Sequence, residues 1–131
     1  MIDYQINASF SNEDLNELFA SAWPSHTFRD FSKQLNHSLA YVVAIEDELL
    51  LGFVNIAWDG GIHAFILDTT VRPSHQRQGI GRRLVHEAID LAQSRGMQWL
   101  HVDFEAGLEP FYHTCGFKHT KAGLIDLAAW H

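Results

Sequence analysis

The sequence is short of cysteine and proline, and it has no long hydrophobic run. Its 131 residues contain one cysteine, Cys115, which excludes an intrachain disulfide and favours a reducing compartment. No apolar stretch approaches the roughly 18 residues of a membrane span, and none has the flanks of a signal peptide. These absences predict a soluble, cytoplasmic protein without a membrane partner.

Positive charge is also scarce, because nine Lys and Arg residues stand against sixteen Asp and Glu residues, a formal net charge of −7. An acidic chain binds phosphate backbones poorly, so we expect no nucleic-acid partner. Four of the nine cations nevertheless fall within twelve residues: Arg72, Arg77, Arg82 and Arg83. This local basic patch indicates a small anionic ligand, with a solvated loop and helix face as the alternative.

What the sequence does have is the length and composition of one globular domain. Apolar residues make up 47% and charged residues 19% of the chain, which is typical of a folded rather than a disordered protein. We find no internal repeat, low-complexity tract or linker. Residues 1–131 are therefore predicted to form a single domain.

Hydrophobic periodicity predicts a mixed succession of strands and helices. Ser11 opens a first helix with an acidic first turn, and Trp23-Pro24 ends it. The clearest helix covers residues 79–95, with an apolar face that ends at Gly96. Further helices are expected at 27–37 and 108–114, strands at 1–8, 39–45, 49–58, 63–71 and 99–104, and a closing hairpin at 117–121 and 124–130.

This order of elements indicates the fold class. Meandering strands come first and are followed by a strand–helix–strand crossover. Such a crossover joins parallel neighbours, whereas the meander joins antiparallel ones. The sequence therefore predicts an α/β (α+β) fold with a mixed, mostly antiparallel central sheet and helices on both faces.

The segment VRPSHQRQGIGRRL, residues 71–84, joins a strand to the longest helix and is the strongest functional signal. Gly79 and Gly81 lie at the helix start, where the missing side chains let backbone N–H groups approach a ligand. The first N–H groups of a helix lack internal partners and bind anions such as a pyrophosphate. No Lys-Ser/Thr follows the glycines and position 84 is leucine, which argues against a nucleoside-triphosphate loop and a dinucleotide fold.

Two motifs about thirty residues apart carry a resemblance. QRQGIG at residues 76–81, preceded by Val71-x-Pro73, matches a Q/R-x-x-G-x-G/A pattern, and FYHTCGF at residues 111–117 matches F-Y-x-x-x-G-F. With these motifs the sequence resembles the GNAT superfamily of acetyl-CoA-dependent N-acetyltransferases, whose element order agrees with the predicted order from end to end. The resemblance implies that fold and acetyl-CoA as co-substrate.

The resemblance also implies roles for individual residues. Backbone groups around Val71 would bind pantetheine and polarise the thioester carbonyl, and the Tyr112 hydroxyl would protonate the departing thiolate. A phenol with a pKa near 10 stays protonated at neutral pH and suits that role, although Tyr112 is alternatively a core tyrosine. The pyrophosphate would be held by Gln76, Arg77, Gln78, Gly79, Ile80, Gly81 and Arg82.

Three positions depart from the family pattern. Arg77 stands where the family often has glycine, and Glu105 stands where many members have an asparagine that helps to hold the cofactor. Phe65 occupies the position of the glutamate base of some histone-modifying relatives, so no base is supplied there. The general base therefore has to come from elsewhere in the chain.

Asp68 is the candidate for binding or deprotonating the acceptor amine, because some relatives that acetylate polyamines carry an acid at the corresponding place. Strict strand alternation would place Asp68 and Val71 on opposite faces, but the family usually has a bulge that breaks this parity. The alternative for Asp68 is a structural acid paired with a nearby arginine. A histidine base acting through water is a further option, since His101 shares a strand face with Asp103 and His63 could approach both; a metal site there has little support.

The family usually builds its acceptor pocket between the first two helices. The residues that we expect to contact substrate are Trp23, His26, Phe28, Asp68 and Glu105, although Trp23 and Phe28 are alternatively core residues. We predict direct transfer of an acetyl group from acetyl-CoA to a primary amine of a small cationic molecule, without a metal. The alternatives are a non-catalytic acyl-CoA-binding or sensing module and an acetyltransferase that acts on a protein amine; a homodimer is left open.

Overall fold

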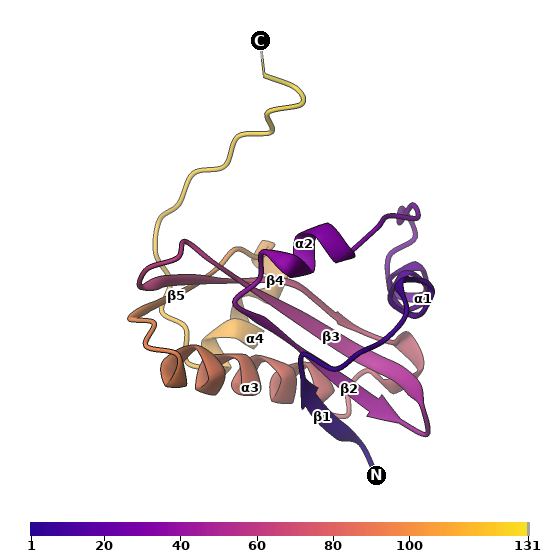
Figure 1. Cartoon of the computed structure of the whole chain (residues 1–131). Helices are drawn as coiled ribbons and strands as arrows, with labels where there is room; N and C mark the ends of the chain where they lie inside the picture. The colour runs from indigo at the N-terminus through magenta and orange to yellow at the C-terminus, as the bar shows by residue number, and fades with distance from the viewer. Residues whose placement is uncertain (131) are drawn as a thin grey trace.

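A five-stranded sheet with the strand order β1-β2-β3-β4-β5 is the framework of the computed structural model, which describes residues 1–130 (Figure 1). The first four strands pair antiparallel with their neighbours, and β5 pairs parallel with β4. The predicted mixed, mostly antiparallel sheet is thus confirmed. The strands are β1 (Asp3–Ile6), β2 (Ala40–Glu46), β3 (Leu49–Trp58), β4 (His63–Val71) and β5 (Trp99–Val102).

Helices cover both faces of the sheet, as the sequence predicted (Figure 1). On one face α1 (Asn12–Ala22) packs Leu15 and Phe19 against Phe53 of β3, and the short α2 (Ser32–Asn36) follows it. On the other face α3 (Ile80–Ser94) and α4 (Glu109–Thr114) pack against the alternate side chains of β2, β3 and β4. Two short 3-10 turns, η1 (Pro73–His75) and η2 (Ala106–Leu108), precede α3 and α4.

The position of α3 depends on Gly52 in β3. A Cβ atom at this position would lie 2.8 Å from Cδ1 of Leu84 and 3.2 Å from Cγ2 of Ile80. Both of those side chains are fully buried on α3, so they have no free space into which to move. The missing side chain therefore lets the start of α3 lie close to the sheet, beside the end of β4.

The predicted helix at residues 27–37 is confirmed only in part, because the structure has a helix at Ser32–Asn36 and none at residues 27–31. Two asparagine side chains of α1 occupy the backbone groups that a longer helix would use. The Asn16 amide donates to the carbonyl oxygen of Arg29 (2.7 Å) and accepts from its N–H (3.0 Å), and Asn12 accepts from the N–H of Phe31 (2.9 Å). Side chains of this kind compete with helical hydrogen bonds. They hold residues 27–31 in an irregular loop over α1.

The predicted closing hairpin is wrong. Residues 118–130 contain no strand, and in Figure 1 this part of the chain leaves the body of the molecule (yellow). The predicted strand at 99–104 is confirmed in part, since β5 ends at Val102. Among residues 1–130, no helix combines the length and the hydropathy needed to cross a bilayer.

Candidate active site

β4 and β5 separate before β4 ends, and this leaves a gap at one side of the sheet. Their pairing runs from His63 beside Trp99 to Ile66 beside Val102 and stops there. β4 continues to Val71, so residues 67–71 have no strand on the β5 side within residues 1–130. No strand of the described chain therefore pairs with this side of residues 67–71, where the carbonyl oxygens of Asp68 and Val71 accept hydrogen bonds from the Thr70 hydroxyl (2.9 Å) and from Nε2 of Gln76 (3.1 Å).

A bulge in β4 determines which face of the sheet each side chain beside the gap points to. Phe53 of β3 pairs with Thr70 and Asn55 pairs with Leu67, so β4 has one extra residue between the two pairs. Asp68 takes up the irregularity with a left-handed backbone (φ 59°), which aspartate tolerates better than most residues.

The predicted bulge is therefore present, yet Asp68 and Val71 still lie on opposite faces of the sheet. Asp68 accepts a hydrogen bond from Gln34 of α2. Val71 faces α3, since its Cγ2 atom lies 3.5 Å from where a Cβ of Gly81 would be. The gap between β4 and β5 is thus bordered by an acid on the α1–α2 side and by the start of α3 on the other.

The loop before α3 presents backbone N–H groups beside Val71. Arg77 (φ 64°) and Gly79 (φ 84°) both have left-handed backbones, which turns the chain sharply into the helix. Arg77 stands where the family often has glycine, and its positive φ is the physical reason why glycine suits that position. No side chain caps the helix at Gly79, and a Cβ there would meet nothing within 4 Å. The loop is therefore open to an anionic ligand at the start of α3.

Only two of the four arginines of the predicted basic patch are available at this loop. Arg72 donates twice to the Leu50 carbonyl oxygen (3.0 and 2.9 Å) and pairs with Glu17 (2.9 Å). Arg83 pairs with Glu87 (3.0 Å), and its guanidinium lies 4.5 Å from the centre of the Tyr4 ring. The four-residue patch is thus corrected to Arg77 and Arg82, which are both exposed; Arg82 makes one long hydrogen bond, to the carbonyl oxygen of Thr114 (3.5 Å).

Tyr112 projects from α4 toward the gap and is only 6% exposed. Its ring stacks on Phe104 with 5.1 Å between ring centres, and Phe111 and Phe117 meet it edge-on. Burial raises the pKa of Tyr112, and the neighbouring Thr69 hydroxyl offsets this only in part. The phenol is therefore protonated at neutral pH.

Two further groups near Tyr112 help to define the chemistry of this pocket. The Thr69 hydroxyl of β4 is buried beside the Tyr112 phenol, but no partner within residues 1–130 meets it in good hydrogen-bonding geometry. A buried polar atom without a partner is costly, so this hydroxyl fits a site that a polar ligand completes. Cys115 is also buried, and burial raises the pKa of its thiol, which disfavours the nucleophilic thiolate.

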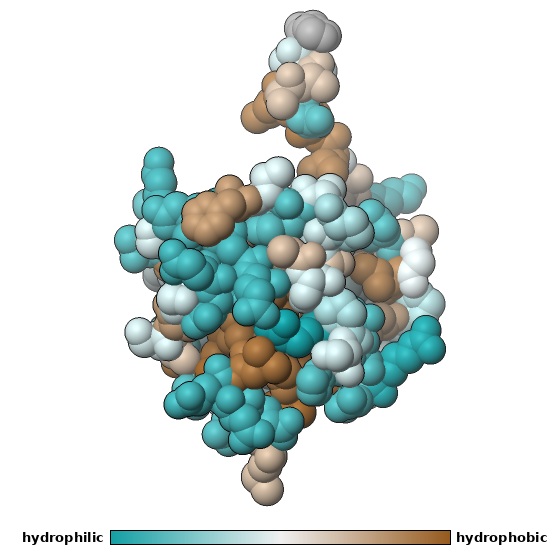
Figure 2. Space-filling view, turned by 90° about the vertical axis from the view of Figure 1, so that its right-hand side faces the viewer, coloured by the Kyte–Doolittle hydropathy of each residue, from teal (hydrophilic) through white to brown (hydrophobic). Residues whose placement is uncertain are grey.

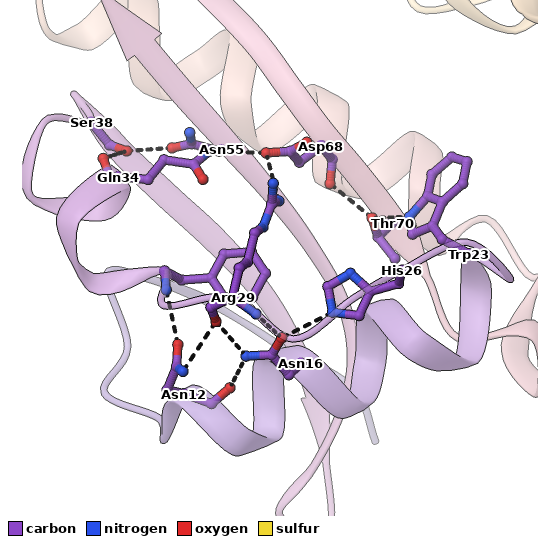
Figure 3. A network of polar contacts seen from close by, with 11 residues as sticks. Asn12, Asn16, Trp23, His26, Arg29, Gln34, Ser38, Asn55, Asp68 and Thr70 are labelled. Atoms are coloured by element: carbon purple, nitrogen blue, oxygen red, sulfur yellow. Dashed lines mark hydrogen bonds and ion pairs between the residues drawn. The ribbon is translucent and has the colours of Figure 1, made fainter.

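On the other face of the sheet, Asp68 belongs to a network of polar contacts (Figure 3). Its Oδ2 atom accepts from Nε2 of Gln34 (2.9 Å) and lies 3.6 Å from Nη2 of Arg29. The predicted alternative of a nearby arginine partner is thus present, although the pair is partly exposed and long. Both contacts use Oδ2, and the side chain keeps 30% of its surface exposed.

Trp23 and His26 border the same network. The Trp23 indole N–H donates to the Thr70 hydroxyl (3.1 Å), and that hydroxyl donates to the carbonyl oxygen of Asp68 (2.9 Å). His26 bonds to the amide oxygen of Asn16 (2.9 Å). These contacts hold the bulge of β4 against the loop that follows α1 (Figure 3).

The remaining predicted residues lie apart from this network. Phe28 is 67% exposed, and Glu105 is an exposed residue just before η2. The rings of His63 and His101 do approach each other, with 2.8 Å between Nδ1 and Nε2. Asp103 does not complete a set with them, and residues 1–130 hold no cluster of three side chains suited to a metal ion.

A cavity of about 440 Å³ adjoins the Asp68 network, and its polar residues were not identified from the sequence. Asn55 is 1% exposed, and its amide oxygen accepts from the Ser38 hydroxyl. One signal could have found Asn55, because it interrupts the apolar strand LLLGFVNIAW, and a buried polar side chain in such a strand needs a partner. The cavity is lined by Asp30, Lys33, Gln34, His37, Ser38, Asn55, Ala57 and Leu67.

Comparisons with known proteins agree on one family. Residues 9–117 match the model of the acetyltransferase (GNAT) family. A GNAT family acetyltransferase from Streptococcus pneumoniae superposes with a TM-score of 0.80 at 26% identity, over 97% of this chain and 99% of that one. An aminoglycoside N-acetyltransferase in complex with CoA has the same fold, with a TM-score of 0.77 at 17% identity over 96% and 93% of the two chains.

The curated relatives are longer than the part of them that this chain matches. The N-alpha-acetyltransferase RimI of Mycobacterium tuberculosis is 34% identical over 102 residues, which is 73% of this chain and 61% of that protein. Across four curated relatives, the chain spans between 31% and 64% of the length of the protein it matches.

Proposed function

The chain belongs to the GNAT acetyltransferase family, and from that premise we propose that it transfers an acetyl group from acetyl-CoA to a primary amine of a small molecule. The supporting observation is the gap between β4 and β5. On one side of it lie Val71, Tyr112 and the open loop before α3. On the other side lie Asp68 and a cavity of about 440 Å³. Two substrates could therefore meet at the gap.

The loop before α3 is suited to the pyrophosphate of acetyl-CoA. Its N–H groups from residue 76 to residue 82 surround a start of α3 that no side chain caps, and Arg77 and Arg82 add charge. Backbone groups at Val71 would pair with the pantetheine arm and polarise the thioester carbonyl, and the arm would replace the hydrogen bond that the Val71 carbonyl oxygen accepts from Nε2 of Gln76 (3.1 Å). These roles are the ones that the match of QRQGIG to the acetyl-CoA motif of the family implies.

Tyr112 is the proposed general acid. In direct transfer, the amine nitrogen forms a bond to the thioester carbon, and the carbon–sulfur bond breaks as electrons pass to sulfur. The phenol would give its proton to that sulfur, a step that a positioned acid accelerates by about 10²- to 10⁴-fold. Burial raises the pKa of Tyr112, so the proton is present at neutral pH. The phenolate is then reprotonated from solvent.

Asp68 is the proposed anchor for the acceptor amine. Both of its internal contacts fall on Oδ2, so Oδ1 can accept a hydrogen bond from a substrate ammonium. Once the ammonium is held there, the carboxylate or a water molecule bound to it takes the proton that the amine must lose. The neighbouring Trp23 and His26 would form the wall of this acceptor site.

A cationic small molecule is the acceptor class that these features favour. The cavity contains the carboxylate of Asp30 and the amides of Gln34 and Asn55 beside one cation, Lys33. Asp68 adjoins it, and the whole chain has a formal net charge of −7. We also propose that residues 1–131 act as one domain and that the protein works in the cytoplasm, where its single buried thiol stays reduced.

The main alternative is acetylation of a protein N-terminus, because RimI of M. tuberculosis, a relative of this chain, is an N-alpha-acetyltransferase. A protein N-terminus is also a primary amine, and its chain would extend out of the cavity. A non-catalytic acyl-CoA-binding module is the other alternative, and the presence of Tyr112 argues against it.

A turnover screen separates these functions. The full chain is incubated with acetyl-CoA and a panel of polyamines, amino sugars, neutral amines and N-terminal peptides, and release of free thiol is measured. We expect turnover with a small cationic amine. Preference for peptides would replace the proposed acceptor class. Binding of acetyl-CoA without turnover on any amine would support the binding module instead.

A further inference from the structure

Arg29, in the loop between α1 and α2, places its guanidinium in surroundings that suit a cation. The guanidinium carbon lies 4.4 Å from the centre of the Phe31 ring and 5.3 Å from that of Phe19. Its Nη2 atom lies 3.6 Å from Oδ2 of Asp68, and Figure 3 shows the side chain reaching from the loop to that carboxylate. Aromatic faces and carboxylates are the groups that bind organic cations in proteins. Arg29 therefore occupies a cation site made by the protein itself.

The two phenylalanine rings of this cation site are fixed parts of the core. Phe19 and Phe31 are 4% and 2% exposed, with 4.9 Å between their ring centres. The His26 ring stacks on Phe31 at 6.4 Å. Figure 2, which faces the side of the molecule that carries α1, shows a mostly hydrophilic surface with apolar side chains in the hollows between polar ones. Because the rings are packed in the core, the site keeps its shape when the guanidinium leaves.

The backbone of Arg29 is anchored, whereas its side chain is held loosely. The buried Asn16 side chain donates to the Arg29 carbonyl oxygen (2.7 Å) and accepts from the Arg29 N–H (3.0 Å). The 3.6 Å contact with Asp68 is too long for a hydrogen bond, and the Arg29 side chain is 45% exposed. The guanidinium can therefore turn into solvent while the loop stays in place, as exposed side chains do within nanoseconds.

We propose that Arg29 is a gate for the acceptor site: its guanidinium holds the place of the substrate ammonium until a cationic acceptor displaces it. The inference rests on the proposed role of Asp68 as the anchor of the acceptor amine. An ammonium bonded to Oδ1 and a guanidinium beside Oδ2 would share one carboxylate, and like charges at such short range repel each other. The acceptor therefore drives the guanidinium outward and takes over its contact with the Phe31 ring.

The gate makes binding depend on the charge of the acceptor and on the body that carries it. A neutral acceptor cannot replace the guanidinium at the carboxylate, so Arg29 stays in place against it. An ammonium on an aliphatic chain replaces both contacts of Arg29, because its charge meets Asp68 and its CH₂ groups cover the Phe31 ring. Between turnovers Asp68 keeps a cationic partner. Arg29 thus determines which acceptors can enter, without taking part in acetyl transfer.

The first test measures binding of the diamine putrescine to the full chain by calorimetry, without acetyl-CoA, so that no turnover takes place. Arg29→Ala should bind putrescine about 3- to 30-fold more tightly than the parent, the range expected for an exposed ion pair together with a cation–π contact. Arg29→Gln, which keeps a long side chain without charge, should change affinity in the same direction. Arg29→Lys retains a competing cation and should stay near the parent. Arg95→Ala removes the same charge at the exposed end of α3 and should also match the parent.

The Asp68→Asn background shows whether the gain in affinity arises at this carboxylate. In that background Arg29→Ala should give little of the gain seen in the parent, because the two residues would be coupled through their contact. An equal gain in both backgrounds would overturn the proposal. So would an Arg29→Ala protein that binds putrescine no more tightly than the parent. Weaker binding by that variant would make Arg29 a direct contact of the acceptor instead.

The second test separates the gate from a structural role and from the proposed function. With a cationic amine that is turned over, Arg29→Ala should lower KM and leave kcat near the parent value, whereas a structural role would not lower KM. If an amine is turned over and Arg29→Ala lowers neither KM nor the dissociation constant of putrescine, the gate is wrong and the proposed function stands. If Arg29→Ala binds putrescine more tightly but no amine is turned over, the gate stands and the proposed function is wrong.

Discussion

At the scale of single residues, the proposed chemistry depends on side chains whose surroundings differ sharply. Tyr112 is enclosed by three phenylalanine rings, whereas Asp68 is partly exposed and held by one amide and one distant guanidinium. Enclosure keeps the phenol protonated, and exposure leaves the carboxylate accessible to a substrate. Substitutions that retain shape can therefore test each role with little effect on folding.

Tyr112→Phe removes the proposed proton donor and keeps the ring that stacks on Phe104. We expect kcat to fall by about 10²- to 10⁴-fold because the thiolate loses its general acid, with little change in acetyl-CoA affinity. Steady-state kinetics and calorimetry measure the two quantities. Tyr4→Phe is the matched control, since that ring packs under Arg83 away from the gap. If kcat is unchanged where chemistry limits the rate, Tyr112 has no part in the mechanism.

Asp68→Asn keeps the shape of the side chain and removes its charge. We expect kcat/KM for the amine to fall by tenfold or more, as for the loss of a charge-assisted contact. The pair with Arg29 is long and partly exposed, so its loss costs at most about 1 kcal/mol and leaves Tm almost unchanged. Asp90→Asn on the exposed surface of α3 is the control. A clear drop in Tm with normal kinetics would instead make Asp68 a structural acid.

At the scale of elements, the loop before α3 and the first turn of that helix act as one binding unit. A Cβ at Gly81 would lie 3.5 Å from Val71 and 3.7 Å from Phe111, which are ordinary contact distances. The protein itself therefore accepts a small side chain at this position. A ligand that approaches the backbone at residue 81 would be blocked by such a side chain. Substitutions at this position can therefore weaken ligand binding without weakening folding.

Gly81→Ala should keep or slightly raise Tm, since alanine is the better helix former by about 0.5–1 kcal/mol. The rise in Tm caused by acetyl-CoA should become smaller, and Gly81→Val should abolish most of it, because both block backbone approach to the pyrophosphate. Thermal melts with and without acetyl-CoA measure this directly. Gly123→Ala, which meets nothing within 4 Å, is the control. Parent-like acetyl-CoA binding by a folded Gly81→Val protein would place the pyrophosphate elsewhere.

The sequence predicted correctly those elements whose position depends on residues close to one another in the chain. The apolar face of α3 and the Ser11 cap of α1 are both present, with the Ser11 hydroxyl accepting from the N–H of Asp14. The first part of the helix predicted at 27–37 is absent because Asn12 and Asn16, more than ten residues away, bond to its backbone groups. The closing hairpin failed because strand pattern alone does not supply a partner strand.

The candidate site was predictable to a similar degree. The glycine-containing motif indicated the loop before α3, and the family resemblance indicated Tyr112 and Asp68; in the structure all three border one gap. The cavity residues Gln34 and Asn55 come from separate elements and follow no motif, so only the folded chain brings them together. Arg72 and Arg83, which pair with acidic side chains, could not be distinguished from Arg77 and Arg82 before the positions of those acids were known.

At the scale of the whole molecule, net charge should affect the two substrates in opposite ways. With a formal net charge of −7, the protein attracts a polyamine and repels acetyl-CoA at long range. We expect kcat/KM for a polyamine to fall as salt rises from 0.01 to 0.2 M, because the Debye length shortens from about 30 Å to below 8 Å. A neutral amine assayed in parallel should show little change. Equal salt dependence for both amines would contradict a charge-selective acceptor site.

The opposite orientation of Asp68 and Val71 has a further consequence for how turnover is organised. If each substrate enters the gap from its own face of the sheet, neither has to leave before the other binds. Order of addition would then be random, and CoA would inhibit without competing against the amine. Only the reactive nitrogen of the acceptor must reach the gap, and the remainder stays on the α1–α2 side. The tolerance of the enzyme for bulky or varied acceptors would accordingly be set by residues that never touch acetyl-CoA, so acceptor range could drift in evolution while the transfer step stays the same.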